Sequence, residues 1–492
     1  MLPEGAIDCC RLAEEVQNEM DTYGNRVLKV EPFGTEHIPE NERHGKPGRL
    51  FTLWFASNVT IGSYAVGYLA VSLFSLPLLP SLVALLAGNL LGGILLGLTS
   101  ATGPSFGYPQ MIISRRSFGR KGAYLPAALQ WSSTVGWFTV NAVLGSFALN
   151  DLLHIGYLPS ALILLSSMII IGIYGHNFIH QFERIMAVVL GLFFAIATAV
   201  VMLHSGRFGH YVPLVHPGVP SFYPYAVLLA GASLSYLMSW GPYASDYSRY
   251  LAESTSRKRI FASTFAGGFI ASLWFEALGA LIAVYVYGNF SNAASVGIIG
   301  SFALILGPLG AASLLAIVLG TLAANALNIY TSALSSLVLD IRMSRWKAVL
   351  FSGIIGSALT VTLSGSFTSF YEGFLLLLDY WITPWLAIVL IDFFVLGHRD
   401  YREVAASPAF RRNGIFSYLL GLLCSVPFIS WGYGNLSYTG FISLNYLGGA
   451  DISYYVALVV TGAVYFLTGR RERISRGQKS GNRTNTSSNI QA

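Results

Sequence analysis

Charged side chains are scarce in this chain. Asp, Glu, Lys and Arg make up 11% of its 492 residues, against roughly 25% in a typical soluble domain. Hydrophobic residues make up 54%, and they form runs of about twenty residues, the length that an α-helix needs to cross a bilayer. Strands of a membrane barrel would instead alternate over about ten residues. The composition therefore predicts an all-α integral membrane protein in the cell membrane.

Cysteine and reactive motifs are equally sparse. The three cysteines are Cys9, Cys10 and Cys424, and their spacing gives neither a disulfide framework nor a zinc site. The sequence contains no phosphate-binding lysine loop and no His-Glu-x-x-His motif. We therefore expect no enzyme activity, no metal and no cofactor apart from a coupling cation, H⁺ or Na⁺. The first 49 residues lack an apolar core, which argues against a cleavable signal peptide.

The apolar runs define twelve expected transmembrane spans. They cover residues 51–75, 81–101, 124–149, 160–175, 184–204, 223–245, 260–287, 311–339, 347–364, 373–396, 414–431 and 453–469. Basic residues follow the even-numbered spans, whereas the loops after odd-numbered spans hold only Arg207. The positive-inside rule then places both termini in the cytoplasm. The net charge of +6 reflects this orientation, so we expect the lipid bilayer as a partner, no nucleic acid and no obligatory protein partner.

The span order also suggests an internal repeat. Five spans per unit would invert the second unit relative to the first, and two further spans would follow. We expect a cytoplasmic N-terminal segment, two inverted repeats of five helices, a pair of C-terminal helices and a disordered cytoplasmic tail. These divisions are residues 1–49, 50–205, 206–396, 397–469 and 470–492.

One stretch interrupts the sixth span. Residues 235–250 read S-Y-L-M-S-W-G-P-Y-A-S-D-Y-S-R-Y, with Gly241-Pro242 directly after Trp240. Proline lacks a backbone N–H and clashes with the preceding turn, so the helix must bend or unwind there. Transporters use such breaks as binding sites. Trp240 is therefore a candidate ligand contact, and the alternative is an ordinary kink with an interfacial tryptophan.

The first span has a polar middle that matches this break. Ser57, Asn58, Thr60 and Gly62 lie within twelve residues that are otherwise mostly apolar. Interruptions at corresponding places in two halves of a chain indicate a transporter binding site. We therefore include Ser57 and Asn58 among the candidate substrate-binding residues.

Two further spans carry polar groups that suit a flat, neutral ligand. In the third span Trp137 and Asn141 are four residues apart, hence on one helix face. In the eighth span Thr321, Asn325 and Asn328 form one stripe. An aromatic ring can stack on a heterocycle while amides hydrogen-bond to its edge. The alternative is that these amides join helix to helix.

Charged groups are nearly absent from the middle of the spans. No Arg or Lys lies there, which argues against phosphate or strongly anionic substrates. Glu276 and Asp379 are the candidates for carrying a coupled proton, and each could instead hydrogen-bond to a neighbouring helix. For Glu183, Asp246 and Asp392, which lie at helix ends, we expect pairing with nearby arginines.

Seven motifs resemble the nucleobase:cation symporter family, on its purine–cytosine permease branch. They are L-W-F-A-S-N-V-T-I-G (53–62), G-P-S-F-G-Y-P-Q-M-I-I-S-R-R-S-F-G (103–119), G-W-F-T-V-N-A-V-L-G (136–145), Y-G-H-N-F-I-H-Q-F-E-R (174–184), W-G-P-Y-A-S-D-Y-S-R-Y (240–250), N-A-L-N-I-Y-T-S-A-L (325–334) and D-Y-W-I-T-P-W-L-A-I-V-L-I-D-F-F (379–394).

The resemblance implies the LeuT-like fold of five-plus-five inverted helices with two additional C-terminal helices. It also implies a small nucleobase substrate that is bound between Trp137 and Trp240 and read by Asn141, Asn325 and Asn328. Sodium-coupled relatives have adjacent hydroxyl residues on the eighth helix, where this chain has Gly320-Thr321. We therefore keep Thr321 as an ion-coupling candidate and expect H⁺ rather than Na⁺.

The expected function is secondary-active import of cytosine or of a purine such as adenine or hypoxanthine, by alternating access. The alternatives within the family are uracil, allantoin, a hydantoin, or a vitamin such as thiamine or pyridoxine. A membrane receptor or a passive channel with the same fold is the alternative of a different class.

Overall fold

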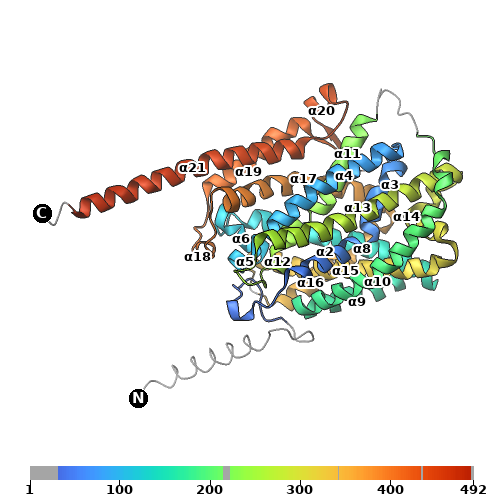
Figure 1. Ribbon diagram of the computed structural model, residues 1–492, viewed down its shortest axis with the longest axis horizontal. Helices are drawn as coiled ribbons and strands as arrows, with labels where there is room; N and C mark the ends of the chain where they lie inside the picture. The colour runs from blue at the N-terminus through green and yellow to red at the C-terminus, as the bar shows by residue number, and fades with distance from the viewer. Residues whose placement is uncertain (1–30, 214–221, 342, 434–435, 489–492) are drawn as a thin grey trace, which may run out of the picture.

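The computed structural model describes residues 31–213, 222–341, 343–433 and 436–488, and it is a bundle of α-helices that lie side by side (Figure 1). The longer helices are α2 (Pro47–Asn58), α3 (Ile61–Ser72), α4 (Leu78–Ser100), α8 (Tyr124–Leu153), α9 (Tyr157–Tyr174), α10 (His176–Leu203), α11 (Tyr223–Met238), α13 (Arg257–Asn289), α14 (Ala293–Leu306), α15 (Gly310–Leu337), α16 (Arg345–Leu363), α17 (Phe367–Leu390), α19 (Arg412–Ser425) and α21 (Ser453–Ser488).

Shorter elements connect them. The helical turns are η1 (Glu40–Glu42), α5 (Gly103–Phe106), α6 (Gln110–Ile113), α7 (Arg115–Phe118), η2 (Ser205–His210), η3 (Gly241–Tyr243), α12 (Ala244–Ser248), η4 (Gly307–Leu309), η5 (Ser364–Ser366), η6 (Ile391–Val395, a π-helix), α18 (Arg402–Ala405), η7 (Val426–Phe428) and α20 (Phe441–Tyr446). Strands β1 (Ser430–Tyr433) and β2 (Leu436–Thr439) pair antiparallel as a hairpin.

Each expected span overlaps a helix or a broken pair of helices, although the eleventh, 414–431, also extends past α19 through η7 into β1. Seven helical stretches of the described chain are long and apolar enough to cross a membrane. The protein is thus a multi-pass membrane protein, while the count of twelve spans and the orientation of the termini stay predictions. Helix α14, which precedes the eighth expected span, corresponds to no expected span.

Both expected helix breaks are present. Span 1 divides between α2 and α3, where Val59 and Thr60 leave helical geometry with ψ values of 64° and 160°. Span 6 divides between α11 and α12, with the Gly241-Pro242 turn between them. Residues from Val59 to Ile61 and from Trp240 to Tyr243 are all buried in protein. Surrounding protein is what allows irregular backbone at membrane depth.

The helix contacts follow the symmetry that two repeats would produce. Helix α4, the second span, packs on α11, the sixth; α13, the seventh, packs on α2 and α3, the first; and α8, the third, packs on α15, the eighth. An inverted repeat would relate span 1 to 6, span 2 to 7 and span 3 to 8. Under this exchange the contact of spans 2 and 6 becomes that of spans 7 and 1, and the contact of spans 3 and 8 stays the same. This pattern supports the paired units that the sequence predicts, although the exact domain limits remain a prediction.

Small residues allow the first and seventh spans to touch closely. A Cβ atom at Gly67 would lie 1.7 Å from the backbone oxygen of Glu276, and one at Gly279 would lie 2.0 Å from that of Tyr64. Such contacts are typical of helix packing inside membranes, where apolar burial alone gives little driving force. They hold the α2–α3 break against α13.

The two ends of the chain are the expected N-terminal segment and C-terminal tail. Helix α21 continues to Ser488 and runs out past the bundle (Figure 1), where the sequence predicts a disordered tail from residue 470. Extending an existing helix adds one hydrogen bond per residue without a new nucleation cost. Of the expected N-terminal segment 1–49, residues 1–30 lie outside the described residues. Residues 31–46, here called the N-terminal strap, lie across one end of the bundle.

Candidate functional site

The two helix breaks touch each other through a side-chain hydrogen bond. The indole Nε1–H of Trp240 donates to Oδ1 of Asn58 over 3.0 Å. The Asn58 amide nitrogen donates to the Trp54 carbonyl of its own helix, at 2.7 Å. The side chain of Asn58, the last residue of α2, therefore binds both its own helix and the ring of Trp240. The Ser57 hydroxyl donates to the Leu53 carbonyl at 2.5 Å, so it bonds to its own helix.

Trp240 lies in an aromatic group at the end of α2 and around η3. Its ring meets that of Trp54 at a centroid distance of 5.6 Å and that of Tyr243 at 4.9 Å, both edge to face. Trp54 also packs on Tyr247 at 5.8 Å. We call these four residues the Trp240 group. Its rings are nearly or wholly buried.

The amides of α15 are joined to the Trp240 group by a chain of hydrogen bonds. The Tyr243 hydroxyl donates to Oδ1 of Asn328 at 2.9 Å, and Nδ2 of Asn328 donates to Oδ1 of Asn325 at 2.8 Å. Nδ2 of Asn325 then donates to the Phe138 carbonyl of α8 at 2.8 Å. Asn325 and Asn328 thus share one face of α15, as the sequence predicts. Their amides also join α15 to α8 and to η3.

Trp137 lies in a second aromatic group, on α8, α11 and α17. Its ring meets those of Tyr236 and Phe374, each at a centroid distance of 5.3 Å, and that of Tyr371 at 6.3 Å. We call these four residues the Trp137 group. No side chain or carbonyl of the described residues accepts the indole N–H of Trp137, although that nitrogen is buried. Nδ2 of Asn141 donates to the Trp137 carbonyl at 3.0 Å.

The rings of Trp137 and Trp240 therefore do not form a closed sandwich in this structure. Among the described residues there is no ring contact between Trp137 and Trp240. Tyr236 connects the two regions: it lies one turn before Trp240, contacts Trp137, and its hydroxyl accepts a 2.7 Å hydrogen bond from Ser63 beside the first break. The binding roles of the predicted residues remain predictions.

Sequence reasoning missed most of the aromatic residues at this site. Tyr236 and Trp240 are four apart, as are Tyr243 and Tyr247, so helical spacing could have found them beside the break. Tyr371 and Phe374 come from α17, and nothing in the sequence signals their approach to Trp137.

The ion-coupling candidates have contrasting surroundings. The Glu276 carboxylate accepts hydrogen bonds from Asn89 at 2.6 Å, Ser233 at 2.7 Å and Ser272 at 3.1 Å, which joins α13 to α4 and α11. Neither carboxyl oxygen of Asp379 has a hydrogen-bond partner among the described residues. The Thr321 hydroxyl donates to the Val318 carbonyl of its own helix at 2.8 Å.

The helix-end carboxylates follow the expectation only in part. Asp392 lies 3.9 Å from Arg116 and 2.9 Å from His398. Asp246 instead accepts from the Gln110 backbone and from the Thr331 hydroxyl, at 2.8 and 2.7 Å. The expected arginine pairing is wrong for Glu183, whose carboxyl oxygens are buried with no partner in the described chain.

Basic residues of several loops meet at one end of the bundle, which we call the basic end. There the strap residue Glu31 accepts hydrogen bonds from Arg249 at 3.0 Å, Tyr250 at 2.5 Å and Tyr330 at 3.0 Å. The side chains of Glu31 and Arg249 are both 0% exposed. Farther along the strap, Arg43 donates to the Pro104 carbonyl at 2.7 Å. The strap thus ties the ends of several helices together.

Electrostatics in the strap itself keep one histidine neutral. Burial and the neighbouring Arg43 guanidinium lower the pKa of His37 to about 4. The His37 ring stacks on Tyr401 at 4.4 Å, in the connection that precedes α18. A neutral imidazole at this contact avoids a second positive charge beside Arg43.

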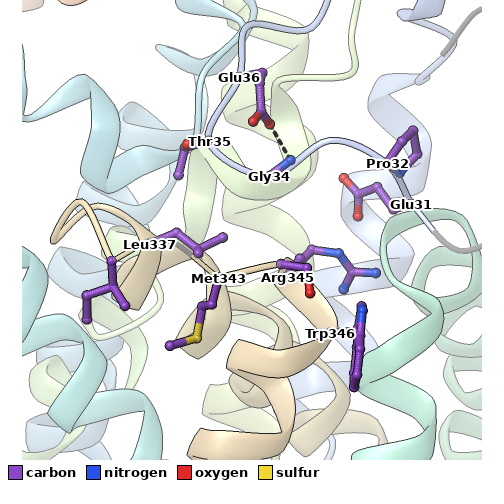
Figure 2. Close-up of a pocket in the computed structure, with 11 residues that line it drawn as sticks. Glu31, Pro32, Gly34, Thr35, Glu36, Leu337, Met343, Arg345 and Trp346 are labelled. Atoms are coloured by element: carbon purple, nitrogen blue, oxygen red, sulfur yellow. Dashed lines mark hydrogen bonds between the residues drawn. The ribbon is translucent and has the colours of Figure 1, made fainter. Parts of the chain in front are cut away.

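A cavity of about 390 Å³ lies between the strap and the connection from α15 to α16 (Figure 2). Its walls include Glu31 and Glu36 on the strap side and Leu337, Arg345 and Trp346 on the other. The Glu36 carboxylate bends back to accept the Gly34 backbone N–H at 2.6 Å. None of the predicted base-binding residues lines this cavity, so it is separate from the helix breaks.

Within the described ranges, no group of three His, Cys, Asp or Glu side chains could hold a metal ion. Two apposed helix breaks, buried aromatic rings and neutral amides instead define the class of the protein: a multi-pass carrier with a central polar site.

Comparisons with known proteins agree with this class. Residues 37–460 match the family model described as permease for cytosine/purines, uracil, thiamine, allantoin. The chain belongs to this family, the nucleobase:cation symporters, and is a membrane transporter rather than an enzyme.

Individual relatives span most of the chain. The Bacillus subtilis protein YxlA, provisionally named a purine-cytosine permease, is 28% identical over 89% of this chain and 96% of its own. The purine-cytosine permease fcyB of Emericella nidulans is 27% identical over 77% and 78%. A solved structure of Mhp1, closed with bromovinylhydantoin bound, aligns with a TM-score of 0.70 at 19% identity, covering 90% of this chain and 95% of Mhp1. This structural likeness shows the fold alone.

Proposed function

We propose that the chain imports a neutral nucleobase, cytosine or a purine such as adenine or hypoxanthine, by symport with H⁺. The observation that supports this most directly is the chain of contacts from Asn58 through Trp240 and Tyr243 to Asn328 and Asn325. It provides aromatic surface and neutral hydrogen-bonding groups without any cation. The names of the relatives YxlA and fcyB point to the same substrate class.

In the ligand-bound state, the base would enter between the Trp137 group and the Trp240 group. Its edge would exchange hydrogen bonds with the amides of Asn141, Asn325 and Asn328, replacing some that these residues make to each other. Base–aromatic stacking contributes about 1–3 kcal/mol per base, and each amide hydrogen bond adds roughly 1 kcal/mol. Stacking and three such bonds sum to about 4–6 kcal/mol, so we expect an affinity no tighter than micromolar, about −8 kcal/mol, which suits a carrier that must release its substrate.

Proton coupling is supported by the contact between the first break and α15. A hard cation is held by several oxygen ligands. Here a Cβ atom at Gly320 would lie 3.1 Å from the Val59 carbonyl, and the adjacent Thr321 hydroxyl is bonded within α15. This region provides no pair of hydroxyls for Na⁺. Glu276, which joins three helices, and Asp379 are the proposed proton-binding groups.

The orientation follows from the basic end. Arginines of the strap and of the loops after α4, α12 and α15 gather there. We infer that this end and both termini face the cytoplasm, because cytoplasmic loops of membrane proteins are rich in Lys and Arg.

The test is transport by the purified protein in liposomes. Radiolabelled cytosine and adenine should exchange in counterflow, and an imposed pH gradient should drive their accumulation without sodium. Unlabelled uracil, allantoin, hydantoin, thiamine and pyridoxine serve as competitors. Failure of cytosine and purines to compete with a vitamin or hydantoin that is transported would refute the substrate proposal, and accumulation that needs sodium would refute H⁺ coupling. Saturable binding without counterflow would indicate a receptor.

A further inference from the structure

One face of α10 carries three titratable side chains in succession. His176, His180 and Glu183 are spaced by four and three residues, so they lie along one side of the helix. They cover about 10 Å of helix length, at 1.5 Å per residue. His176 lies at the basic end, where its backbone N–H donates to Glu31 of the strap. Glu183 lies deeper in the bundle.

All three residues carry buried polar atoms without partners. Both carboxyl oxygens of Glu183 and the Nδ1 atoms of His176 and His180 are buried, and no described residue forms a hydrogen bond with them. Unpartnered buried polar atoms are rare in folded proteins and call for an explanation. Arg184, the neighbouring cation in sequence, is exposed on another side of the helix. A structural ion pair therefore does not account for Glu183.

The face is continuous with the strap at its outer end. The rings of His176 and His180 are 4.4 Å apart, and His176 lies 3.9 Å from Tyr250. The strap residue His44 lies 6.4 Å from His176, and its Nε2 hydrogen-bonds to Asn177 of α10 at 3.0 Å. His44 is partly exposed. The succession of imidazoles thus reaches water at the basic end.

Its inner end leads toward the proposed base site. The ring of His180 packs on that of Tyr247 at a centroid distance of 6.1 Å. Tyr247 also contacts Trp54, and Trp54 in turn contacts Trp240. The indole nitrogen of Trp54 is another buried atom without a partner in the described residues. Farther along α10, Leu190 packs near Gly320 at the first helix break. The polar face therefore stops just below the breaks.

Most of the charged groups around this face are basic, and the strap carboxylate Glu31 is the acidic group among them. The strap and α2 contribute His44 and Arg49, and the strap carboxylate Glu31 is already paired with Arg249. The other titratable groups around the face are phenols: Tyr247 and Tyr250 beside α12, and Tyr330 of α15. Of these groups, only imidazole has an unperturbed pKa near neutrality.

We propose that Glu183, His180 and His176 form the route by which the coupled proton leaves toward the cytoplasm. The proposal rests on the H⁺ symport proposed above and applies whichever group binds the proton beside the base. The Glu183 carboxyl O–H breaks and its proton passes to Nδ1 of His180 across one bridging water, since the two groups are not hydrogen-bonded to each other in this structure; that imidazolium releases the proton from Nε2 toward His176 and His44. Glu183 remains as a carboxylate until it is protonated again from the side of the base site.

The decisive variant is Glu183→Gln, which keeps the shape of the side chain and removes the titratable proton. In liposomes we expect it to retain counterflow of labelled cytosine and adenine, because exchange needs no net proton movement. Accumulation driven by a pH gradient, and the acidification that substrate evokes inside the liposomes, should fall by about tenfold or more. His180→Gln should act in the same direction.

Matched controls lie on the same helix. Gln181 is exposed and next to the face, and His204 lies at its far end, bonded to the Val200 carbonyl. Gln181→Ala and His204→Gln should both accumulate substrate like the unaltered protein. Normal pH-driven accumulation by Glu183→Gln would overturn the route. Loss of counterflow in the same proportion as accumulation would also overturn it, since that pattern indicates damage to binding or folding.

A second measurement is independent of transport. Infrared difference spectra of the purified protein between acid and alkaline pH should show the carbonyl stretch of a carboxylic acid that is missing in Glu183→Gln. An identical spectrum in the variant would refute Glu183 as the proton carrier. If the unaltered protein accumulates base without any pH dependence, H⁺ coupling itself is refuted, and the route with it; a variant that fails alone refutes only the route.

Discussion

The Trp240 group and the Trp137 group are both aromatic and largely buried, yet the indole N–H groups of Trp240 and Trp137 differ in their surroundings. In the Trp240 group the indole N–H of Trp240 is bonded to Asn58 and the Tyr243 hydroxyl to Asn328, whereas the indole N–H of Trp54 has no partner in the described chain. In the Trp137 group the indole N–H of Trp137 has no acceptor in the described chain. The indole of Trp240 therefore joins the two breaks, while that of Trp137 is a buried donor without an acceptor among the described residues.

The largest effects should come from removing either ring. Trp240→Ala and Trp137→Ala should each lower the free energy of unfolding by about 3–5 kcal/mol and abolish measurable counterflow. Trp240→Ala should be the more destabilising, because it also leaves Asn58 Oδ1 without its donor. Thermal unfolding in detergent measures the first effect. Trp346→Ala is the control, since that ring is 44% exposed. A smaller loss of stability in Trp240→Ala than in Trp137→Ala would contradict the comparison.

A smaller effect is expected at the bond between the breaks. Asn58→Ala leaves the buried indole N–H of Trp240 unpaired, which should cost about 1–3 kcal/mol of stability. In a double-mutant cycle with Trp240→Phe, the two changes should couple by at least about 0.5 kcal/mol. Ser57→Ala is the matched control, because that hydroxyl bonds only within α2. Additive effects of Asn58→Ala and Trp240→Phe would show that the bond does not join the breaks.

Replacing Trp137 or Trp240 with phenylalanine tests the difference between their indole N–H groups directly. Trp137→Phe should leave the melting temperature nearly unchanged, since its N–H makes no bond here. It should weaken binding of cytosine or adenine by about fivefold, the loss of one hydrogen bond of roughly 1 kcal/mol. Calorimetric titration of both variants measures this. Unaltered affinity in Trp137→Phe would mean that the available N–H does not meet the ligand.

The smallest effect should follow from Tyr243→Phe. This change removes the hydroxyl that occupies Oδ1 of Asn328 and should cost about 1 kcal/mol of stability or less. With that amide oxygen released, the preference between cytosine and purines should shift in competition assays. Tyr247→Phe is the comparison, because its hydroxyl donates to the Leu327 carbonyl and touches no amide. Equal selectivity in both variants would argue against Asn328 as a reader of the base.

The sequence was sufficient for the features that depend on local chemistry. Gly241-Pro242 and the polar middle of the first span predicted the two breaks, and the spacing of Asn325 and Asn328 predicted their shared face. Positive charge in alternate loops predicted that arginines would gather at one end. Each of these inferences follows from backbone geometry or from the cost of charge in lipid, so no knowledge of distant contacts was needed.

Features that depend on packing between distant spans were not predictable. Tyr371 and Phe374 reach Trp137 from α17, and no local pattern specifies that approach. Glu183 was misjudged because Arg184 follows it in the sequence. Adjacent helix residues point about 100° apart, so the arginine is exposed while the carboxyl group is buried.

The strap has a consequence for the order in which the molecule is assembled. Glu31 is synthesised before any span, yet its partners Arg249 and Tyr330 follow 218 and 299 residues later. Contacts across such sequence separations form late, after the intervening helices have been inserted and packed. The strap is thus the first described segment to be synthesised and the last to dock. Its docking shows that the helix bundle is complete.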